Sequence, residues 1–262
     1  MSIPRETLDS ISEIYHENTK DRERVIPMDF GYAPATGPWH RAFKKYPHRP
    51  RLALSVPEPA ASPGAEEVMR SRRTLRQFAG EPLTLTEVER LLYFTNGITG
   101  AVPLEGGTLP LRASPSAGAL YPIEVYLAAL SVDGLEQGIY HYEVEGNALE
   151  FVRPGSFGEE IFEITHRQEM VREASACLFM TAMFGRTKHK YGERGYRYVL
   201  LDAGHLAQNL YLESTALGLG CATIGGFLDD RANRLIGVDG LEESVLYMAV
   251  VGRVLSNGGE KV

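Results

Sequence analysis

The sequence predicts an α+β fold in which layers of helix and sheet bury a sizeable hydrophobic core. Its 262 residues are 44% apolar, which is enough to bury a sizeable core. Segments with helical spacing of apolar residues are interleaved with short apolar runs typical of strands. They lack the regular alternation of a doubly wound parallel sheet, so layers of helix and sheet are favoured. We find no internal repeat or low-complexity tract.

Charge and composition exclude several classes of protein. The net charge of -7 argues against a surface built to attract nucleic acid or anionic lipid. No signal peptide is recognisable, and no apolar run approaches the ~18 residues of a membrane span. We therefore expect a cytoplasmic protein with no nucleic-acid partner and no membrane partner.

The two cysteines and the histidines indicate no metal site. Cys177 and Cys221 lie in apolar segments, where a buried thiol is favoured over a disulfide or metal pair. The histidines show no metal-ligand spacing. A reducing compartment fits this use of cysteine.

The chain divides into an N-terminal part, residues 1–63, and a compact domain, residues 64–262. An amphipathic helix is predicted over residues 5–18. Its apolar face consists of Leu8, Ile11, Ile14 and Tyr15. Prolines recur between residues 27 and 63 and disfavour helix, so this segment is expected to be an extended arm. The arm either wraps a partner or forms a surface linker.

Two helices open the domain. A short helix is predicted over residues 65–73, and a longer one over residues 82–97 ends at Gly97. Two pairs in the longer segment have capping-box spacing, and the sequence does not choose between them. They are Thr84 with Glu87 and Thr86 with Glu89. The apolar face of this helix consists of Val88, Leu91, Leu92 and Thr95.

The remaining apolar runs have the length and composition of strands. They cover residues 123–130, 138–144, 148–152, 177–184, 221–226 and 244–252. The second and third flank Glu145-Gly146-Asn147 and predict a hairpin. A glycine-rich loop is expected at residues 100–107.

A long helix is predicted from Asp202, as its N-cap, to the glycines at 218 and 220. Its apolar face consists of Ala203, Leu206, Ala207, Leu210 and Leu217. His205, within this segment, is expected to be a structural imidazole. The glycines close a helix and precede a strand, so they do not form a dinucleotide-binding fingerprint, which opens a helix.

The first cluster with possible chemistry is rich in arginine. Arg72, Arg73, Thr74 and Arg76 place three guanidiniums and a hydroxyl within five positions of an acidic chain. Such a group can surround a phosphate with charge-assisted hydrogen bonds. The alternative is a solvated basic patch.

Two further clusters combine small residues with the ends of strands. Residues 114–122, SPSAGALYP, would let the backbone approach a flat ring closely, although a strand-entry turn explains the pattern too. Residues 223–227, TIGGF, follow an apolar strand. Their paired glycines indicate either close approach of a ligand or a tight turn.

A fourth cluster, residues 186–198, is basic and rich in tyrosine. It lies between a predicted buried strand and the long helix, which is a natural place for a substrate loop. Lys190 beside a cofactor could act as a base, and Tyr191 could orient or relay the proton. The alternative is a solvent-facing loop with ion pairs.

In this order, the clusters resemble the nitroreductase superfamily, and more closely its SagB/ThcOx-type branch, which includes azoline dehydrogenases. The resemblance spans residues 64–255, and YHENTK at residues 15–20 resembles a recurring start in this branch. It implies a nitroreductase-like FMN-binding fold whose central, mainly antiparallel sheet is flanked by helices and preceded by an extended N-terminal arm. It also implies a homodimer with FMN at the subunit interface.

The resemblance assigns roles to the motifs. SRRTLRQF resembles the motif that contacts the flavin phosphate and ribityl chain, which implicates Arg72, Arg73, Thr74 and Arg76. SPSAGALYP resembles the flavin-ring loop usually supplied by the other subunit, which implicates Ser114, Pro115, Ser116 and Gly118. IGGF and VVGR resemble the segment over the ring face and the C-terminal phosphate contact, which implicate Gly225, Gly226 and Arg253.

The implied activity is two-electron dehydrogenation of a thiazoline or oxazoline in a ribosomally made peptide, giving an azole. Lys190 and Tyr191 would be catalytic, oxygen would reoxidise the flavin, and a cyclodehydratase and a precursor peptide would be partners. Simple nitroreductases have Asn and Glu where this chain has Ala119 and Gly225, which fits the SagB-like branch. Two alternatives stay open, namely an NAD(P)H-dependent nitro or quinone reductase and a non-catalytic flavin-binding accessory subunit.

Overall fold

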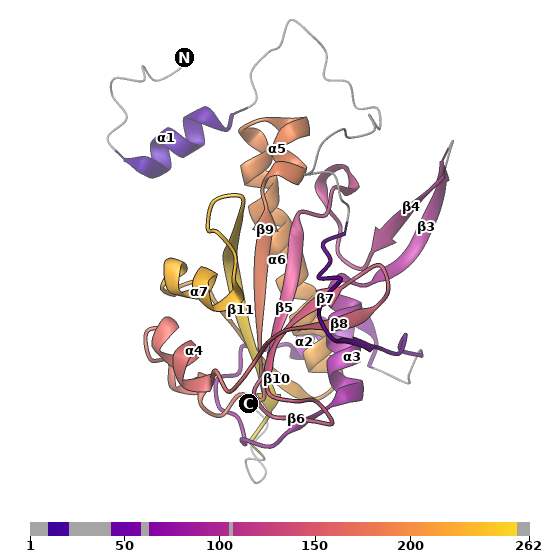
Figure 1. Ribbon diagram of the computed structural model, residues 1–262, viewed down its shortest axis with the longest axis vertical. Helices are drawn as coiled ribbons and strands as arrows, with labels where there is room; N and C mark the ends of the chain where they lie inside the picture. The colour runs from indigo at the N-terminus through magenta and orange to yellow at the C-terminus, as the bar shows by residue number, and fades with distance from the viewer. Residues whose placement is uncertain (1–9, 21–42, 59–62, 105–106, 256–262) are drawn as a thin grey trace, which may run out of the picture.

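The computed structural model describes residues 10–20, 43–58, 63–104 and 107–255. A seven-stranded sheet forms its centre, and every neighbouring pair of strands in it is antiparallel (Figure 1). In spatial order the strands are β1 (Arg51–Ala53), β8 (Ala148–Pro154), β7 (Gly138–Glu143), β5 (Ile123–Ala129), β9 (Ala176–Met183), β11 (Glu243–Arg253) and β10 (Leu219–Ile224). All six predicted strands are present, and β7 and β8 form the predicted hairpin.

Helices flank this sheet, as the α+β prediction requires. The α-helices of the described part are α1 (Ile11–Asn18), α2 (Ala65–Ser71), α3 (Leu85–Asn96), α4 (Gly158–Ile164), α5 (Gly185–Tyr191), α6 (Arg194–Ala216) and α7 (Asp229–Ile236). Two short 3-10 helices are η3 (Ala117–Ala119) and η4 (Glu169–Val171). In α3 the structure selects Thr84 and Glu87 as the capping box, and Gly97 is the C-cap.

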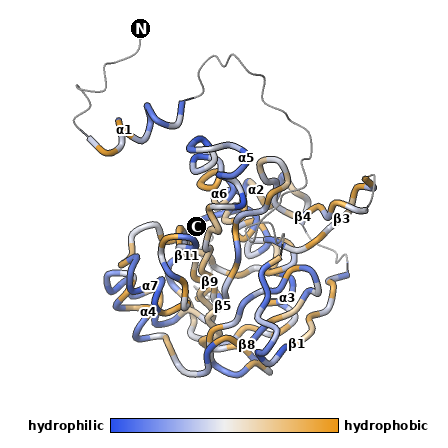
Figure 2. The backbone as a smooth tube through the Cα atoms, turned by 45° about the horizontal axis from the view of Figure 1, so that its top comes forward, coloured by the Kyte–Doolittle hydropathy of each residue, from blue (hydrophilic) through white to orange (hydrophobic). Residues whose placement is uncertain are grey.

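Two hydrophobic cores lie on opposite faces of the sheet because strand side chains alternate in direction. Val125 and Leu127 of β5 belong to the core shared with α3 and α6. Tyr126 and Ala128 belong to the core shared with α4 and α7. Hydrophobic residues accordingly run through β5, β9 and β11 in the middle of the molecule (Figure 2). Cys177 and Cys221 are free and buried, as expected.

Residues 98–104 and 107–112 form a two-stranded sheet where a glycine-rich loop over residues 100–107 was expected. Strand β3 (Ile98–Leu104) pairs with β4 (Gly107–Arg112) in an antiparallel register. Both strands contain a proline, which is tolerated because each strand of a two-stranded sheet is an edge. A second small sheet pairs β2 (Leu83–Thr84) with β6 (Val132–Asp133) in parallel.

Three predictions about the region before and within α6 were wrong. Asp202 is not an N-cap, because α6 begins at Arg194. The basic cluster is not a loop, because α5 and the first turns of α6 contain it. His205 is exposed rather than a buried structural imidazole, although it lies among apolar neighbours in sequence.

The described part of the N-terminal region contacts the domain. Helix α1 begins at the N-cap Ser10, and residues 5–9 of the predicted helix lie outside the described residues. Its expected apolar face is largely exposed at Ile11 and Ile14, since the helix meets α6 through polar contacts. Arg194 and Arg197 of α6 donate hydrogen bonds to Thr19. Most of the predicted proline-rich arm lies outside the described residues, but its described part supplies β1 to the main sheet.

Candidate functional site

The arginine-rich segment, residues 72–79, lies along the sheet edge formed by β10 and β11. The amide of Leu75 donates to the carbonyl of Cys221 at 3.0 Å, and the amide of Ala79 donates to the carbonyl of Arg253 at 2.9 Å. These contacts fix the backbone of the motif against two buried strands. The arginines themselves remain at the surface or half-buried.

Tyr211 of α6 organises the start of this segment. The guanidinium of Arg72 lies 5.2 Å from the centroid of its ring, and the hydroxyls of Thr74 and Tyr211 are 3.1 Å apart. Among the described residues, no carboxylate pairs with Arg72, Arg73 or Arg76. Arg73 Nη1 donates to the carbonyls of Arg70 and Arg72. Guanidiniums without carboxylate partners are available to bind an anion.

The predicted glycines and Arg253 lie toward opposite ends of β10. Leu219, at the start of β10, pairs with Arg253, whereas Gly225 and Gly226 follow its last residue. Six residues of strand separate the two positions by ~20 Å. A Cβ atom added to Gly226 would meet nothing within 4 Å. A flat group can therefore approach this glycine.

Arg253 is engaged within the chain. Its Nη1 and Nη2 atoms donate to the two carboxylate oxygens of Glu87 at 3.1 and 2.9 Å, and its Nε donates to the carbonyl of Pro82 at 3.0 Å. The side chain thus connects β11 to the N-terminal turn of α3. We call Arg72, Arg73, Thr74, Arg76, Gly225, Gly226 and Arg253 together the arginine half-site.

The predicted ring loop, residues 114–122, begins with a buried serine. Ser114 Oγ donates to the carbonyl of Thr95 at 2.7 Å and accepts from Asn209 at 3.0 Å. Ser116 Oγ donates to the carboxylate of Asp202 at 2.6 Å. Both hydroxyls have partners in the chain, so the backbone of this loop is the part left to meet a ligand.

The loop and the predicted catalytic pair come together in one protomer. Pro115 is exposed, and Gly118 has a left-handed φ of 64°. A Cβ atom added to Gly118 would lie 2.6 Å from Tyr191 Oη and 3.3 Å from Lys190 Nζ. Lys190 and Tyr191 therefore touch the loop at Gly118, where a larger residue would displace the Tyr191 hydroxyl. We call Ser114, Pro115, Ser116, Gly118, Lys190 and Tyr191 the loop half-site.

Helix α6 contacts both half-sites, at different heights and on different sides. Asp202 holds the loop half-site, and Tyr211 contacts Arg72 and Thr74. Nine helical residues correspond to two and a half turns, so these side chains are ~13 Å apart along the axis and point in opposite directions. Within one protomer the two half-sites therefore lie on opposite sides of α6.

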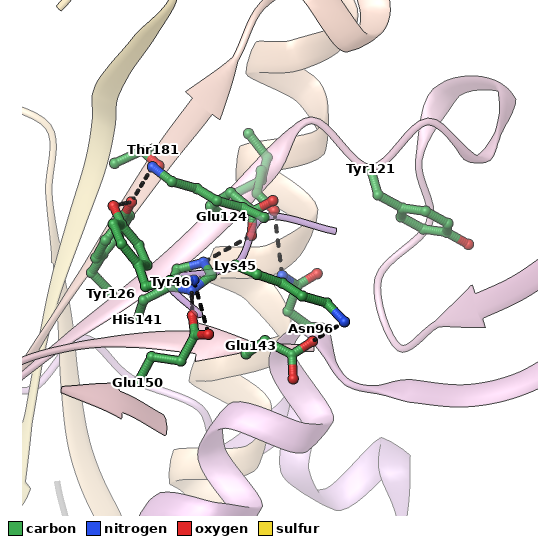
Figure 3. A network of polar contacts seen from close by, with 12 residues as sticks. Lys45, Tyr46, Asn96, Tyr121, Glu124, Tyr126, His141, Glu143, Glu150 and Thr181 are labelled. Atoms are coloured by element: carbon green, nitrogen blue, oxygen red, sulfur yellow. Dashed lines mark hydrogen bonds and ion pairs between the residues drawn. The ribbon is translucent and has the colours of Figure 1, made fainter. Parts of the chain in front are cut away.

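A buried ionic network lies beside the loop half-site (Figure 3). The guanidinium of Arg186 pairs with the carboxylate of Glu124, whose other oxygen lies 3.2 Å from His141 Nε2. His141 Nδ1 lies 2.8 Å from a carboxylate oxygen of Glu150. Burial alone would raise the pKa of Glu124, but Arg186 and His141 outweigh it and hold that pKa well below its usual range.

The same network raises the pKa of His141. Burial lowers the pKa of its imidazole, but the hydrogen bonds to Glu124 and Glu150 outweigh burial and raise the pKa above 6.5. The sequence prediction missed this network. The sequence could have predicted the network, because Glu124, His141 and Glu150 are charged or ionisable residues within otherwise apolar strand segments.

A separate cavity of about 500 Å³ lies between α2, α3 and α6. Its lining includes Val68, Met69, Phe94 and Leu212, and it contains none of the predicted site residues. In the described part of the chain, no three His, Cys, Asp or Glu side chains gather as metal ligands, and no helix has the length and apolar character of a membrane span.

Comparison with known proteins places this geometry in a family. The model of the nitroreductase family matches residues 69–253, which contain every residue of both half-sites. The chain belongs to the nitroreductase family. This nitroreductase-family chain is 35% identical to "Putative nitroreductase MJ1384" of Methanocaldococcus jannaschii over 72% of its own length and 90% of that protein. Membership of the family supports an oxidoreductase.

Two curated relatives belong to peptide processing. The microcin B17-processing protein McbC of Escherichia coli is 28% identical over 66% of this chain and 63% of McbC. The trifolitoxin-processing protein TfxB of Rhizobium leguminosarum is 28% identical over 65% of this chain and 48% of TfxB. These similarities confirm the resemblance to the SagB/McbC-type branch of the superfamily.

Solved structures agree with the predicted fold. A nitroreductase-like protein from Anabaena variabilis superposes with a TM-score of 0.73 at 30% identity, over 92% of this chain and 47% of that one. The E. coli McbBCD microcin synthetase complex, solved with a truncated pro-MccB17 bound, gives a TM-score of 0.59 at 26% identity, over 80% of this chain and 78% of that one. This chain spans about half the length of TfxB and of the Anabaena protein.

Proposed function

We propose that this protein is an FMN-dependent oxidoreductase that dehydrogenates a thiazoline or oxazoline in a ribosomally made peptide to the azole. The observation that carries the proposal is the contact of Lys190 and Tyr191 with Gly118 of the ring loop. It places a basic group beside the segment that resembles the flavin-ring loop. The similarity to McbC and TfxB supports a peptide substrate.

The residues of the arginine half-site fit FMN. Arg72, Arg73 and Arg76 have no carboxylate partner among the described residues and would hold the phosphate, with Thr74 beside them. The open space at Gly226 suits a flat ring. When bound, FMN supplies the two-electron acceptor of the dehydrogenation.

The chain itself supplies the proton chemistry. Oxidation of an azoline to an azole removes one hydrogen as a proton and the other with an electron pair. Lys190 Nζ would take the proton as a general base, and Tyr191 Oη would orient that amine or relay the proton. The aromatic product is much more stable than the azoline, so aromatisation favours the reaction. Oxygen would be the final oxidant.

We propose that the active site is shared between the protomers of a homodimer. In one protomer the loop half-site and the arginine half-site lie on opposite sides of α6, so a single cofactor cannot contact both directly. A two-fold dimer would bring the loop half-site of one protomer to the arginine half-site of the other. Residues 64–262 would form the FMN-binding domain, and residues 1–63 would be an N-terminal extension of it.

A cyclodehydratase and a precursor peptide are the proposed partners. The McbBCD complex, a structural neighbour of this chain, is bound to a truncated precursor. Helix α5 ends in three basic residues, Lys188, His189 and Lys190, which would favour an acidic peptide segment. The cytoplasm is the proposed compartment, which suits two buried, reduced cysteines.

The test begins with the cofactor. The purified protein should be yellow and should release FMN on denaturation, and Arg72→Ala or Arg253→Ala should lower its FMN content. Since Glu87 already occupies Arg253, we expect the larger loss from Arg72→Ala. A colourless protein that FMN cannot reconstitute would overturn the proposal.

The second step separates catalysis from binding. Lys190→Ala should keep FMN but lose azole formation from an azoline peptide. Lys45→Ala is the control, because Lys45 is a lysine that pairs with Glu145 and belongs to neither half-site. Rapid anaerobic bleaching of the flavin by NADPH, with no azole formed, would instead indicate a nitro or quinone reductase. Unchanged azole formation by Lys190→Ala would exclude its role as the base.

A further inference from the structure

We propose that Asp202 and Arg186 are positioning residues that fix the ring loop against α5, which carries Lys190 and Tyr191, and against α6. The inference rests on the proposed function for the role of the loop. It gives a role to two side chains to which the family resemblance assigned none. Neither residue is proposed to touch the substrate or the cofactor.

The loop needs such support because its backbone is strained. Besides Gly118, the non-glycine residues Ala119 and Tyr121 have left-handed φ angles of 52° and 46°. Residues with a Cβ atom rarely adopt this conformation, and each such residue raises the free energy of the native state. Strained backbone persists where surrounding contacts hold it, and such places are often functional.

Asp202 holds the first half of the loop. Its carboxylate accepts from Ser116 Oγ at 2.6 Å and from the amide of Ala117 at 3.4 Å. Ser116 Oγ in turn accepts from the amide of Tyr121 at 2.9 Å. One side chain of α6 thereby ties both ends of the strained segment together. The segment cannot shift without breaking these bonds.

Arg186 holds the other end of the loop. Its Nη1 donates to the carbonyl of Tyr121 at 2.9 Å and pairs with Glu124, at the start of β5. Arg186 and Glu124 are 3% and 1% exposed. Figure 3 shows the side chain of Glu124 pointing toward His141. Because a buried ion pair adds little net stability, the fixed geometry is its more plausible benefit.

The two contacts couple the loop to the catalytic pair. Arg186 lies one turn before Lys190 on α5, and Asp202 lies on α6, which packs against α5. The loop, Lys190 and Tyr191 are therefore held in fixed positions relative to one another. A base must lie within hydrogen-bonding distance of its proton, so this coupling sets the position from which Lys190 acts.

The first experiment needs no flavin. Amide hydrogen exchange in the full-length chain should become about tenfold faster at Ala117 and Tyr121 in Asp202→Ala, with a smaller effect in Asp202→Asn, which keeps one acceptor. Asn233→Ala is the control, because Asn233 is buried and holds the amide of Val245 on another side of the molecule. Equal exchange at Ala117 and Tyr121 in all variants would overturn the inference.

The second experiment measures the consequence for chemistry. At saturating FMN, Asp202→Ala and Arg186→Lys should reduce kcat for azoline oxidation by ~10- to 100-fold while KM changes little, and should shift the visible absorption of the bound flavin. Arg186→Lys keeps the charge beside Glu124, so folding is retained. Unchanged kcat and absorption in both variants would overturn the inference.

The two experiments also separate this inference from the proposed function. If the wild-type protein binds no FMN but Asp202→Ala accelerates exchange in the loop, the proposed function fails and the loop contact stands. If FMN binds and azole forms while the loop exchanges normally in every variant, the proposed function stands and the positioning role fails.

Discussion

At the scale of single residues, Gly118 is the position where conformation and close approach coincide. It has a left-handed φ, and both Tyr191 and Lys190 lie against its missing side chain. The sequence predicted that small residues here allow close approach. It could not show that the approaching groups belong to the same chain, because Gly118 and Lys190 are 72 positions apart in the sequence.

We expect Gly118→Ala to destabilise the protein more than Gly134→Ala. Both substitutions place alanine at a left-handed φ, which costs about 1 kcal/mol. Only the first also forces a contact with Tyr191, which adds about 1 to 3 kcal/mol. An added Cβ at Gly134 would meet nothing within 4 Å, so this position isolates the backbone effect. If urea unfolding shows equal losses in the free energy of unfolding for both variants, the loop accommodates the added methyl group without further cost.

His141 predicts a pH dependence of stability. Its pKa is raised in the folded protein above 6.5, because hydrogen bonds to Glu124 and Glu150 outweigh its burial. The native state therefore keeps a proton that the unfolded chain loses as pH rises. The contribution of His141 to the free energy of unfolding should therefore be largest near or below pH 6.5. It should fall as the pH rises through the pKa of His141 in the folded protein.

Urea unfolding between about pH 6 and pH 9 measures this effect. His141→Gln should remove that part of the decline, whereas His48→Gln, at an exposed position, should leave it in place. A decline of equal size in wild type and His141→Gln would show that other groups are responsible.

At the scale of elements, helix α3 agrees with the prediction from its sequence, whereas the start of helix α6 does not. For α3 the capping pattern and the apolar face agree with each other, and only the choice between two capping pairs was open. For α6 the preference of aspartate for N-caps suggested a start at Asp202. The real start at Arg194 depends on packing against α5, and Asp202 uses its carboxylate for the ring loop instead.

Thr84→Ala should destabilise the protein by about 1 kcal/mol, because it removes the N-cap of α3. Thr86→Ala is the matched control, since Thr86 is exposed, lies two residues later and is not the cap. It should change the free energy of unfolding by less than about 0.5 kcal/mol. Urea unfolding of both variants decides the matter, and a larger loss from Thr86→Ala would contradict the assignment.

At the scale of the whole molecule, the two half-sites on opposite sides of α6 lead to the shared active site. If each site combines the loop half-site of one protomer with the arginine half-site of the other, two inactive variants can complement each other. A heterodimer of Lys190→Ala and Arg72→Ala contains one doubly defective site and one intact site. If each site were instead confined to one protomer, no mixture of the two variants would contain an intact site.

Mixing the two variants through unfolding and refolding should therefore restore about a quarter of wild-type azoline oxidation, since about half of randomly formed dimers are heterodimers. Each variant refolded alone is the control and should remain inactive. Absence of any recovery, together with a dimeric mass by sedimentation, would place each site within one protomer.

The sequence by itself determined the α+β class, six of the seven strands of the main sheet and the hairpin, and it supplied the residues that we propose for the site. These follow from local patterns, namely apolar periodicity, turn residues and clusters of one chemistry, which neighbouring residues set. Only the tertiary structure decided where α6 begins, that residues 98–104 and 107–112 pair as strands, and that Asp202 and Arg186 contact the loop, with Glu124 and His141 continuing the network from Arg186. Such contacts join positions far apart in the chain, and their energy arises only once the sheet and α6 have packed.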